Sequence, residues 1–554
     1  MSAQGTSSEA ERGGIGAIRS RLKVWEVRPW TLLLVVAWVA STAFVAWHLN
    51  QGWVPHDDGA FAQSAQRVLD GQLPHRDFTE LYTGGLTFLN AAVFALFGQN
   101  LIWLRIPMFL LFAAYVPCVY ALARRFAPPL VSLLAALFAV AWGPATYPAA
   151  VPSWYLLFFS VFGALALLRY LETHHARWLV VAGVFGGLSI SFKIVGVWYV
   201  IAALLFLVFI EQDAHHKGVG GRVRLGAYGL FVIAFACLSL APVFSVLHSH
   251  LGGAEIVNFL VPIVAVCGFV IMNEARVEET SSRARLSELL RLVVPFLIGV
   301  AVPIVAILIP YIFTRSVGEI LFGVLASPRS RLEDTYTGIL DPVALLIAAP
   351  VAVALVGRCF VKPTVRRVID VTGVVVLVMV FATANSLFSY TLLWTSARGL
   401  APLVVVAGTA ALAFGSDRFA PPRARNGVFL LLALASFGSL VQFPFGAPIY
   451  FCYVAPLFAL AAIAASRYAR AAGGLLPIAL LVTYTLFGFI WLDRGAIYWF
   501  GVAPYTNPQT VILDHRRASI RVTPEDRAMY RDVAALLRRH TPGQFTYAGP
   551  DAPE

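Results

Sequence analysis

Long apolar runs recur along almost the whole chain, and they constrain the fold more than any other feature of the sequence. Each run is about 20 residues long, which is the length that an α-helix needs to cross a hydrocarbon core of about 30 Å. Hydrophobic residues fill 59% of the 554 positions and charged residues only 13%, whereas soluble domains are about a quarter charged. The runs predict an all-α polytopic membrane protein. We expect crossings at 30–49, 101–122, 128–147, 149–170, 178–192, 194–210, 225–247, 257–272, 292–313, 340–357, 368–390, 396–415, 427–443, 448–466 and 474–492.

The basic residues fall in alternate loops between these runs, which is the positive-inside pattern of a membrane protein with a cytoplasmic N-terminus. This explains the net charge of +12 without nucleic acid as a partner. The five cysteines are scattered and form no C-x-x-C, so neither a disulfide framework nor a zinc site is indicated. No N-x-S/T sequon occurs, which favours a bacterial cytoplasmic (inner) membrane. The basic loops contain Arg12 to Arg28, Arg124 and Arg125, Arg169 and Arg177, Lys217 to Arg224, Arg276 to Arg291, Arg358 to Arg367, Arg418 to Arg425, and Arg467 and Arg470.

The run at 82–98 is long enough to cross, yet a crossing there would place Arg124 and Arg125 outside and invert every later basic loop. We therefore expect an interfacial or re-entrant helix, and one external loop over 50–100 with two juxtamembrane helices. The first of them begins at Asp57 or Asp58, either of which can cap it, and ends at Gly71. We expect about fifteen crossings, with 13 or 14 as alternatives, and an odd number places the C-terminus outside.

These patterns divide the chain into a cytoplasmic segment (1–28), a transmembrane domain (29–492) and an extracytoplasmic C-terminal segment (493–554). A second external loop spans 314–338. The C-terminal segment predicts a small α/β appendage, with strands at 510–513 and 518–522, a helix at 524–540 and a strand at "FTYAG". The segment breaks off at "GPDAPE", which leaves open that it is truncated.

The acidic residues of the 50–100 loop are the first candidates for chemistry. A carboxylate at the membrane surface can accept a proton from a hydroxyl or hold a divalent cation. Asp57 and Asp58 are adjacent, and Glu80 follows in the same loop. His56 is a further candidate ligand, and together with the two aspartates it could hold Mg or Mn. The alternative is a helix cap and ordinary surface acid.

Three basic residues near the external ends of apolar runs are candidates for binding phosphate. Lys193 interrupts an apolar stretch over 178–210, where burial of its charge costs about 2.5–3.5 kcal/mol on insertion scales. Arg105 and Arg398 begin or end external crossings, and a guanidinium binds phosphate oxygens in pairs. The alternatives are a loop lysine and arginines that reach back to the interface. Weaker candidates are Arg315, Arg329 and Arg331, and the pair His248 and His250 as metal ligands.

The stretch "DDGAFAQSAQRVLDGQLPHRDFTELYTGGLTFLNAAVFALFGQNLIWLRIPMF" resembles the first external loop of GT-C fold glycosyltransferases. The closest resemblance is to families 39 and 83, which include lipid A aminoarabinose transferases and dolichyl-phosphate-mannose-protein mannosyltransferases. It covers roughly the first 200 residues. Two departures concern the substrate: "ELYT" replaces an E-K-P-P run, and an H-P-P segment is absent.

The resemblance implies a hexosyl- or pentosyltransferase that moves a sugar from a polyprenyl-phosphate carrier to a lipid, glycan or protein hydroxyl on the external face, with inversion. Carried over, Asp57 matches the catalytic acidic residue at the start of the first juxtamembrane helix, and Glu80 matches a second acidic residue. Arg105 matches the arginine that opens the next crossing, and Lys193 a lysine that contacts the donor phosphate. We expect Asp57 to be the general base, with Asp58 and Glu80 positioning the acceptor or a metal.

Two other classes compete with the transferase. A transporter or flippase of a lipid-linked sugar explains the crossings and Lys193, although the chain shows no internal repeat. A polymerase or ligase of lipid-linked glycans is the other, although such a protein typically has its large loop late in the chain. No P-loop, G-x-S-x-G or H-E-x-x-H motif occurs, so nucleotide hydrolysis and serine chemistry have no support.

Overall fold

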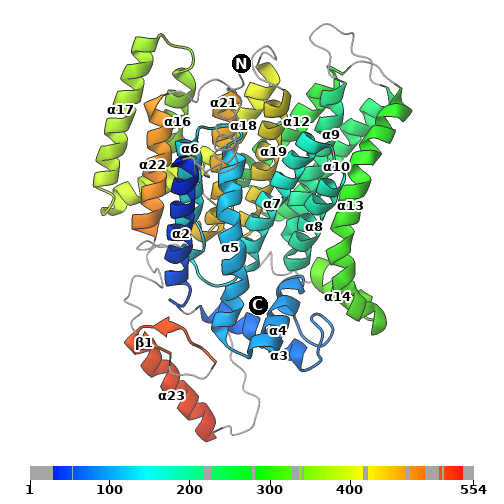
Figure 1. The fold of residues 1–554 in the computed structure, drawn as a ribbon, viewed down its shortest axis with the longest axis vertical. Helices are drawn as coiled ribbons and strands as arrows, with labels where there is room; N and C mark the ends of the chain where they lie inside the picture. Colours follow the sequence, from blue (N-terminus) through cyan, green and yellow to red (C-terminus); the bar gives the residue numbers. More distant parts are fainter. Residues whose placement is uncertain are drawn as a thin grey trace, which may run out of the picture.

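The computed structural model describes residues 29–52, 54–215, 226–277, 281–326, 336–339, 342–415, 422–468, 474–492, 511–513 and 517–540. Nearly all of them are helical, and the helices run side by side in one bundle (Figure 1). The longer helices are α2 (Pro29–His48), α5 (Leu101–Ala123), α6 (Pro129–Ala141), α7 (Pro152–Thr173), α8 (Arg177–Phe192), α9 (Val197–Ala214), α10 (Ala227–Leu247), α12 (Val261–Glu274), α13 (Ser282–Phe313), α16 (Val343–Gly357), α17 (Pro363–Ala382), α18 (Leu387–Phe414), α19 (Pro422–Gly438), α21 (Ala455–Tyr468) and α22 (Leu475–Phe487).

Each of the fifteen predicted crossings has one of these helices at its position. Within the described residues, eleven helices are long and apolar enough to cross a membrane, and α8, α16 and α21 are shorter apolar helices. The prediction of an all-α polytopic membrane protein is therefore confirmed. A membrane imposes this outcome because every backbone polar group in the hydrocarbon region has to be hydrogen-bonded within the protein.

The run at 82–98 forms α4 (Gly85–Phe97), which lies with α3 (Ala60–Leu69) at one end of the bundle (Figure 1). The same end carries α14 (Val317–Leu325) and the C-terminal helix α23 (Pro524–His540). We call it the loop end. The chain passes from α3 through α4 directly into α5, as expected for a surface helix followed by the next crossing.

The described parts of the basic loops lie at the opposite end of the bundle, which we call the basic end. Arg125 contacts Glu172 at 2.6 Å, and Arg276 donates to the carbonyl of Ala413 at 2.9 Å. Loops that are far apart in sequence therefore lie together here, as the alternation of basic residues predicts.

Several predicted boundaries were wrong because proline-rich segments interrupt the apolar runs. The crossing predicted at 128–147 ends at Ala141, and the next begins at Pro152, which leaves a buried loop over 142–151 with Pro144 and Pro148. The crossing predicted at 448–466 is divided into α20 (Pro448–Cys452) and α21. Proline lacks a backbone N–H and fixes its φ angle, so it favours helix starts over helix interiors. Both breaks lie toward the loop end.

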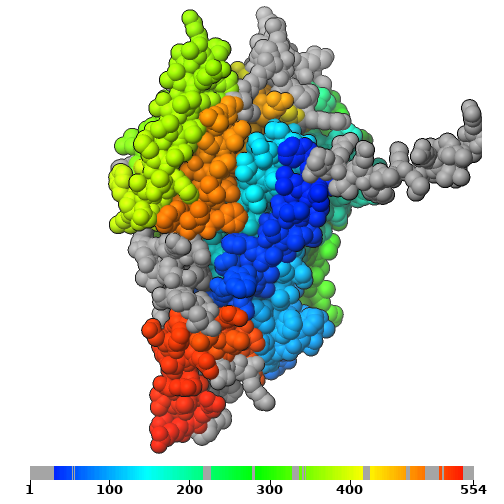
Figure 2. Space-filling model, turned by 60° about the vertical axis from the view of Figure 1, so that its left-hand side comes forward, coloured from blue at the N-terminus to red at the C-terminus, as the bar shows by residue number. Residues whose placement is uncertain are grey.

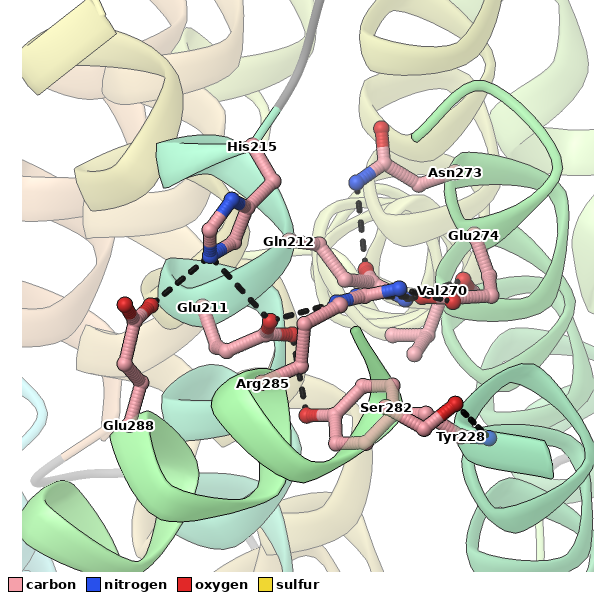
Figure 3. Close-up of polar contacts among 10 residues, drawn as sticks. All are labelled: Glu211, Gln212, His215, Tyr228, Val270, Asn273, Glu274, Ser282, Arg285 and Glu288. Atoms are coloured by element: carbon pink, nitrogen blue, oxygen red, sulfur yellow. Dashed lines mark hydrogen bonds and ion pairs between the residues drawn. The ribbon is translucent and has the colours of Figure 1, made fainter. Parts of the chain in front are cut away.

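Helix α13 begins ten residues before the predicted crossing at 292, and Arg285 in its first turns is buried in a charged network at the basic end (Figure 3). Arg285 bonds Glu211 with Nε at 2.7 Å and Glu274 with Nη1 at 2.5 Å, and Tyr228 donates to Glu211 at 2.9 Å. The network joins α9, α10, α12 and α13. Burial of these charges is tolerable because each of them is paired and hydrogen-bonded.

The C-terminal helix is present over the predicted residues, as α23. The two strands are shorter than predicted: β1 (Val511–Ile512) pairs antiparallel with β2 (Arg521–Val522). The segment 1–28 and the predicted strand at "FTYAG" lie outside the described residues, as do Arg329 and Arg331.

Candidate functional site

Asp57 lies in η1 (Pro55–Gly59), the turn that precedes α3 at the loop end. Its carboxylate accepts a hydrogen bond from the hydroxyl of Tyr147, which reaches it from the loop between α6 and α7. The side chain is 13% exposed, so solvent still reaches it. Burial raises the pKa of Asp57 above its ordinary value, because the charged form loses hydration. Such a carboxylate is a stronger base than a surface aspartate.

Lys193 lies in the break between α8 and α9 and faces the same region. Its Nζ atom donates to Ser153 Oγ at 3.2 Å and lies 5.3 Å from the ring centre of Tyr82 and 5.7 Å from that of Tyr450. Burial lowers the pKa of Lys193 to about 8, while attraction to Asp57 opposes this shift. Aromatic faces stabilise an ammonium ion by cation–π attraction. The arrangement holds one cation close to one accessible carboxylate.

The juxtamembrane helix α4 brings Tyr82 to Lys193. At Gly85, the first residue of α4, a Cβ atom would lie 2.5 Å from the carbonyl oxygen of Ser191 near the end of α8. Glycine is therefore needed for this approach. Tyr82 precedes Gly85 by three residues and is held in turn by His75, whose Nε2 lies 2.9 Å from the Tyr82 carbonyl oxygen.

Asp58 and Arg105 form a fully buried ion pair, with both side chains 0% exposed. Arg105 donates to Asp58 Oδ1 at 3.3 Å and Oδ2 at 2.5 Å. It also donates to the carbonyls of Leu49, Gln51 and Gly52 at 2.9, 3.2 and 2.9 Å. A guanidinium has five N–H donors, and these five bonds use all of them. Arg105 therefore fixes the loop between α2 and η1.

Glu80 is 5% exposed and bonds within the loop end itself. It accepts from Thr87 Oγ1 at 2.8 Å and from the backbone N–H of Leu81 at 2.9 Å. Burial raises the pKa of Glu80 above its ordinary value. These bonds place it at the start of α4, and no described contact joins it to Asp57.

Arg398 is buried in the middle of α18, where its Nη2 donates to the carbonyl of Gly446 at 2.8 Å. Among the described residues its Nε atom has no hydrogen-bond partner. Gly446 belongs to the segment that carries Tyr450, whose ring lies close to Lys193. Arg398 therefore helps to hold this segment in place through its bond to Gly446. His248 and His250 lie in a separate turn, where His250 stacks on Tyr336.

The proposed metal set of His56, Asp57 and Asp58 does not fit the geometry. Both Asp58 oxygens are bonded to Arg105, and the carboxylate of Asp57 lies 3.9 Å from His56 Nε2. Two ligands then remain, whereas Mg and Mn prefer several oxygen ligands. Another group with metal-ligand atoms close together is Glu211, His215 and Glu288 at the basic end (Figure 3). Its Glu211 already accepts from Arg285 and Tyr228. We therefore derive no step through a metal.

Four residues of the site were missed from the sequence: Tyr82, Tyr147, Ser153 and Tyr450. Three of them lie in the proline-rich segments "GPATYPAAVPSW" and "FPFGAPIYFCY", for which hydropathy predicts mostly helix. The prolines themselves were a signal for these residues. A proline-rich break at the loop end of a bundle places polar and aromatic side chains beside the external loop.

Comparison with known proteins agrees with the resemblance found in the sequence. A family model described as dolichyl-phosphate-mannose-protein mannosyltransferase matches residues 85–245. The matched segment contains Arg105 and Lys193 and begins after Asp57 and Glu80. No curated protein matches the chain.

Two solved structures align at low identity. The oligosaccharyltransferase of Archaeoglobus fulgidus aligns with a TM-score of 0.42 and 15% identity over 96% of this chain and 61% of that one. ArnT of Cupriavidus metallidurans aligns with a TM-score of 0.27 and 13% identity over 83% of this chain and 78% of that one. The chain thus spans 61% of the length of the first structure. At these TM-scores, the family-model match is the comparison that bears on function.

These findings support a general class: a multi-pass membrane protein that resembles GT-C glycosyltransferases dependent on a polyprenyl-phosphate sugar. The family-model match covers 161 of the 554 residues, counted from 85 to 245, which is less than half of the chain.

Proposed function

We propose that the protein transfers a sugar from a polyprenyl-phosphate carrier to an acceptor hydroxyl at the loop end of the bundle, with inversion at the anomeric carbon. The observation that carries the proposal is the partly exposed Asp57 carboxylate with the Lys193 ammonium near it. We place the loop end outside and the basic end in the cytoplasm of a bacterial cell, following the positive-inside rule.

The proposed reaction is a single displacement. The acceptor oxygen attacks the anomeric carbon, and the bond between that carbon and the phosphate oxygen breaks. Asp57 takes the hydroxyl proton as the new glycosidic bond forms. The leaving group is the polyprenyl phosphate, whose developing negative charge Lys193 stabilises. An ammonium ion that is already positioned by Ser153 and two aromatic rings needs little reorganisation for this task.

Burial distinguishes the two adjacent aspartates. Asp57 is 13% exposed and Asp58 is 0% exposed with both oxygens bonded to Arg105. A general base has to come within hydrogen-bond reach of its substrate. We therefore assign catalysis to Asp57, and positioning of the Asp57 turn to Asp58 and Arg105. Arg398 stays a candidate for binding the donor phosphate, and Glu80 for positioning the acceptor.

The test of this function is a donor-cleavage assay with the purified protein in nanodiscs. A panel of hexosyl and pentosyl polyprenyl phosphates is supplied, and release of polyprenyl phosphate is measured. Turnover of one donor establishes the transferase and selects between hexose and pentose. If no donor is cleaved while a fluorescent lipid-linked sugar crosses the bilayer at a protein-dependent rate, the flippase is correct and the proposal fails.

The pH dependence of turnover is expected to be bell-shaped. Asp57 acts in its ionised form, so the rate falls as pH drops below its raised pKa. Lys193 acts in its protonated form, so the rate also falls as pH rises above its pKa of about 8. Each limb changes the rate about tenfold per pH unit. Lys193→Arg should move the alkaline limb upward because arginine stays protonated. An alkaline limb that is unmoved in this active variant would exclude Lys193 as its source.

A further inference from the structure

A groove of about 460 Å³ lies between the C-terminal helix α23 and the juxtamembrane helices α3 and α4. Figure 2 shows the C-terminal segment, in orange-red and red, against the blue residues of the early chain at the loop end. Four arginines line the groove together with one tyrosine and four side-chain amides: Arg517, Arg527, Arg531, Arg538, Tyr530, Gln63, Gln66, Gln99 and Asn100.

Backbone hydrogen bonds attach the C-terminal segment to both ends of the 50–100 loop. Arg521 donates its N–H to the Asn50 carbonyl at 2.7 Å, and Gly52 donates to the Arg521 carbonyl at 3.0 Å. At the other end, Leu101 donates to the Arg517 carbonyl at 2.8 Å. The groove therefore has a defined position relative to the loop that carries Asp57.

The charge of the groove is one-sided. None of the described lining residues is acidic, although α23 also carries Glu525, Asp526 and Asp532. Two of these acids have polar partners, since Asp526 accepts from Thr523 at 2.8 Å and Asp532 lies 3.8 Å from Arg531. Several arginines along one groove create a positive potential that attracts an anion and can bind carboxylate or phosphate in pairs of hydrogen bonds.

The rest of the lining is mostly apolar, and its polar part, the four amides and Tyr530, favours a sugar over a peptide as the anion. Side-chain amides both donate and accept, which matches the hydroxyls of a glycan. Tyr530 adds an aromatic surface with a polar tip, suited to contact with a ring that is apolar on one face. These groups are contributed by α3, by the turn before α5 and by α23, so a bound chain would contact all three.

We propose that this groove binds an anionic glycan and that such a glycan is the acceptor class of the transferase. The inference rests on the function proposed above and adds the acceptor. The physical link to the site is short. Gly52, which bonds Arg521, also accepts from Arg105, and Arg105 holds Asp58 beside Asp57. A chain of hydrogen bonds therefore joins the C-terminal segment to the turn that carries Asp57.

Binding of defined probes to the full chain in nanodiscs tests the proposal without turnover. The probes are an oligogalacturonate, a neutral maltooligosaccharide of equal length and an oligoglutamate of equal charge. We expect saturable binding of the oligogalacturonate alone. Arg538→Gln should weaken it about tenfold, because it removes a charge-assisted hydrogen bond to the anion. The matched control is Arg539→Gln, which removes the same charge from the same helix outside the groove lining and should change affinity less than about twofold.

Equal binding of the oligoglutamate would overturn the proposal in favour of an acidic peptide. Equal losses of affinity in Arg539→Gln and in the groove variant would mean that net charge alone attracts the glycan. That outcome would also overturn the proposal. Donor cleavage in the absence of any glycan separates this test from that of the proposed function. A chain that cleaves donor but does not bind the anionic glycan keeps its function and loses this acceptor. A chain that binds the glycan but cleaves no donor refutes the transferase instead.

Discussion

Asp57→Asn is expected to lower the turnover of the donor by about 10²–10⁴-fold, the usual contribution of a general base. The amide has nearly the shape of the carboxylate and can still accept from the Tyr147 hydroxyl, so the turn should keep its conformation. What is lost is the ability to take a proton from the acceptor. The measurement is the initial rate of glycosyl transfer in nanodiscs, with the thermal unfolding midpoint recorded on the same samples.

The matched control for this substitution is Asp70→Asn, which removes the same charge at the exposed end of α3. It should leave both the rate and the unfolding midpoint near those of the unchanged protein. If Asp57→Asn keeps near-normal turnover, the base lies elsewhere. Glu80, with its raised pKa, would then be the next residue to replace.

Arg105→Ala is expected to destabilise the protein by about 3–5 kcal/mol, because it leaves the Asp58 carboxylate buried without its partner. It also removes the donors from three backbone carbonyls of the loop after α2. The measurement is the thermal unfolding midpoint in detergent, with donor binding measured separately. Arg105→Lys should recover only part of the loss, since an ammonium has three donors and cannot replace the five of the guanidinium.

This substitution also decides between two roles for Arg105. If the guanidinium binds the donor phosphate, as its position in the sequence predicts, Arg105→Ala should weaken donor binding at nearly unchanged stability. If it fixes the loop, stability falls first, and Asp58→Asn/Arg105→Ala should be less destabilised than the sum of the single variants. Such a double-mutant cycle isolates the energy of the pair. Arg124→Ala, at the exposed end of α5, is the control for loss of an arginine from the same helix.

The sequence alone determined the helices and the end of the bundle to which each loop belongs. Hydropathy is a local property of about twenty residues, and the membrane converts it directly into helices because lipid offers no partner for the backbone. The basic residues of the following loops also separate 82–98 from the crossings, and the structure places this segment as α4 at the loop end. The boundaries that were wrong fell at Pro144, Pro148 and Pro448, where local packing decides how long an interrupted helix continues.

Only the tertiary structure distinguished the members of the candidate site. Asp57 and Asp58 are adjacent and chemically identical, and their burial depends on residues far away in the chain. Asp58 is paired with Arg105, which lies 47 positions later, whereas Asp57 meets Tyr147, which lies 90 positions later. Charge and solvent access at one atom are set by all the helices around it, and no local pattern contains that information. The sequence thus determined which residues reach the loop end, and packing determined which carboxylate remains accessible to act there.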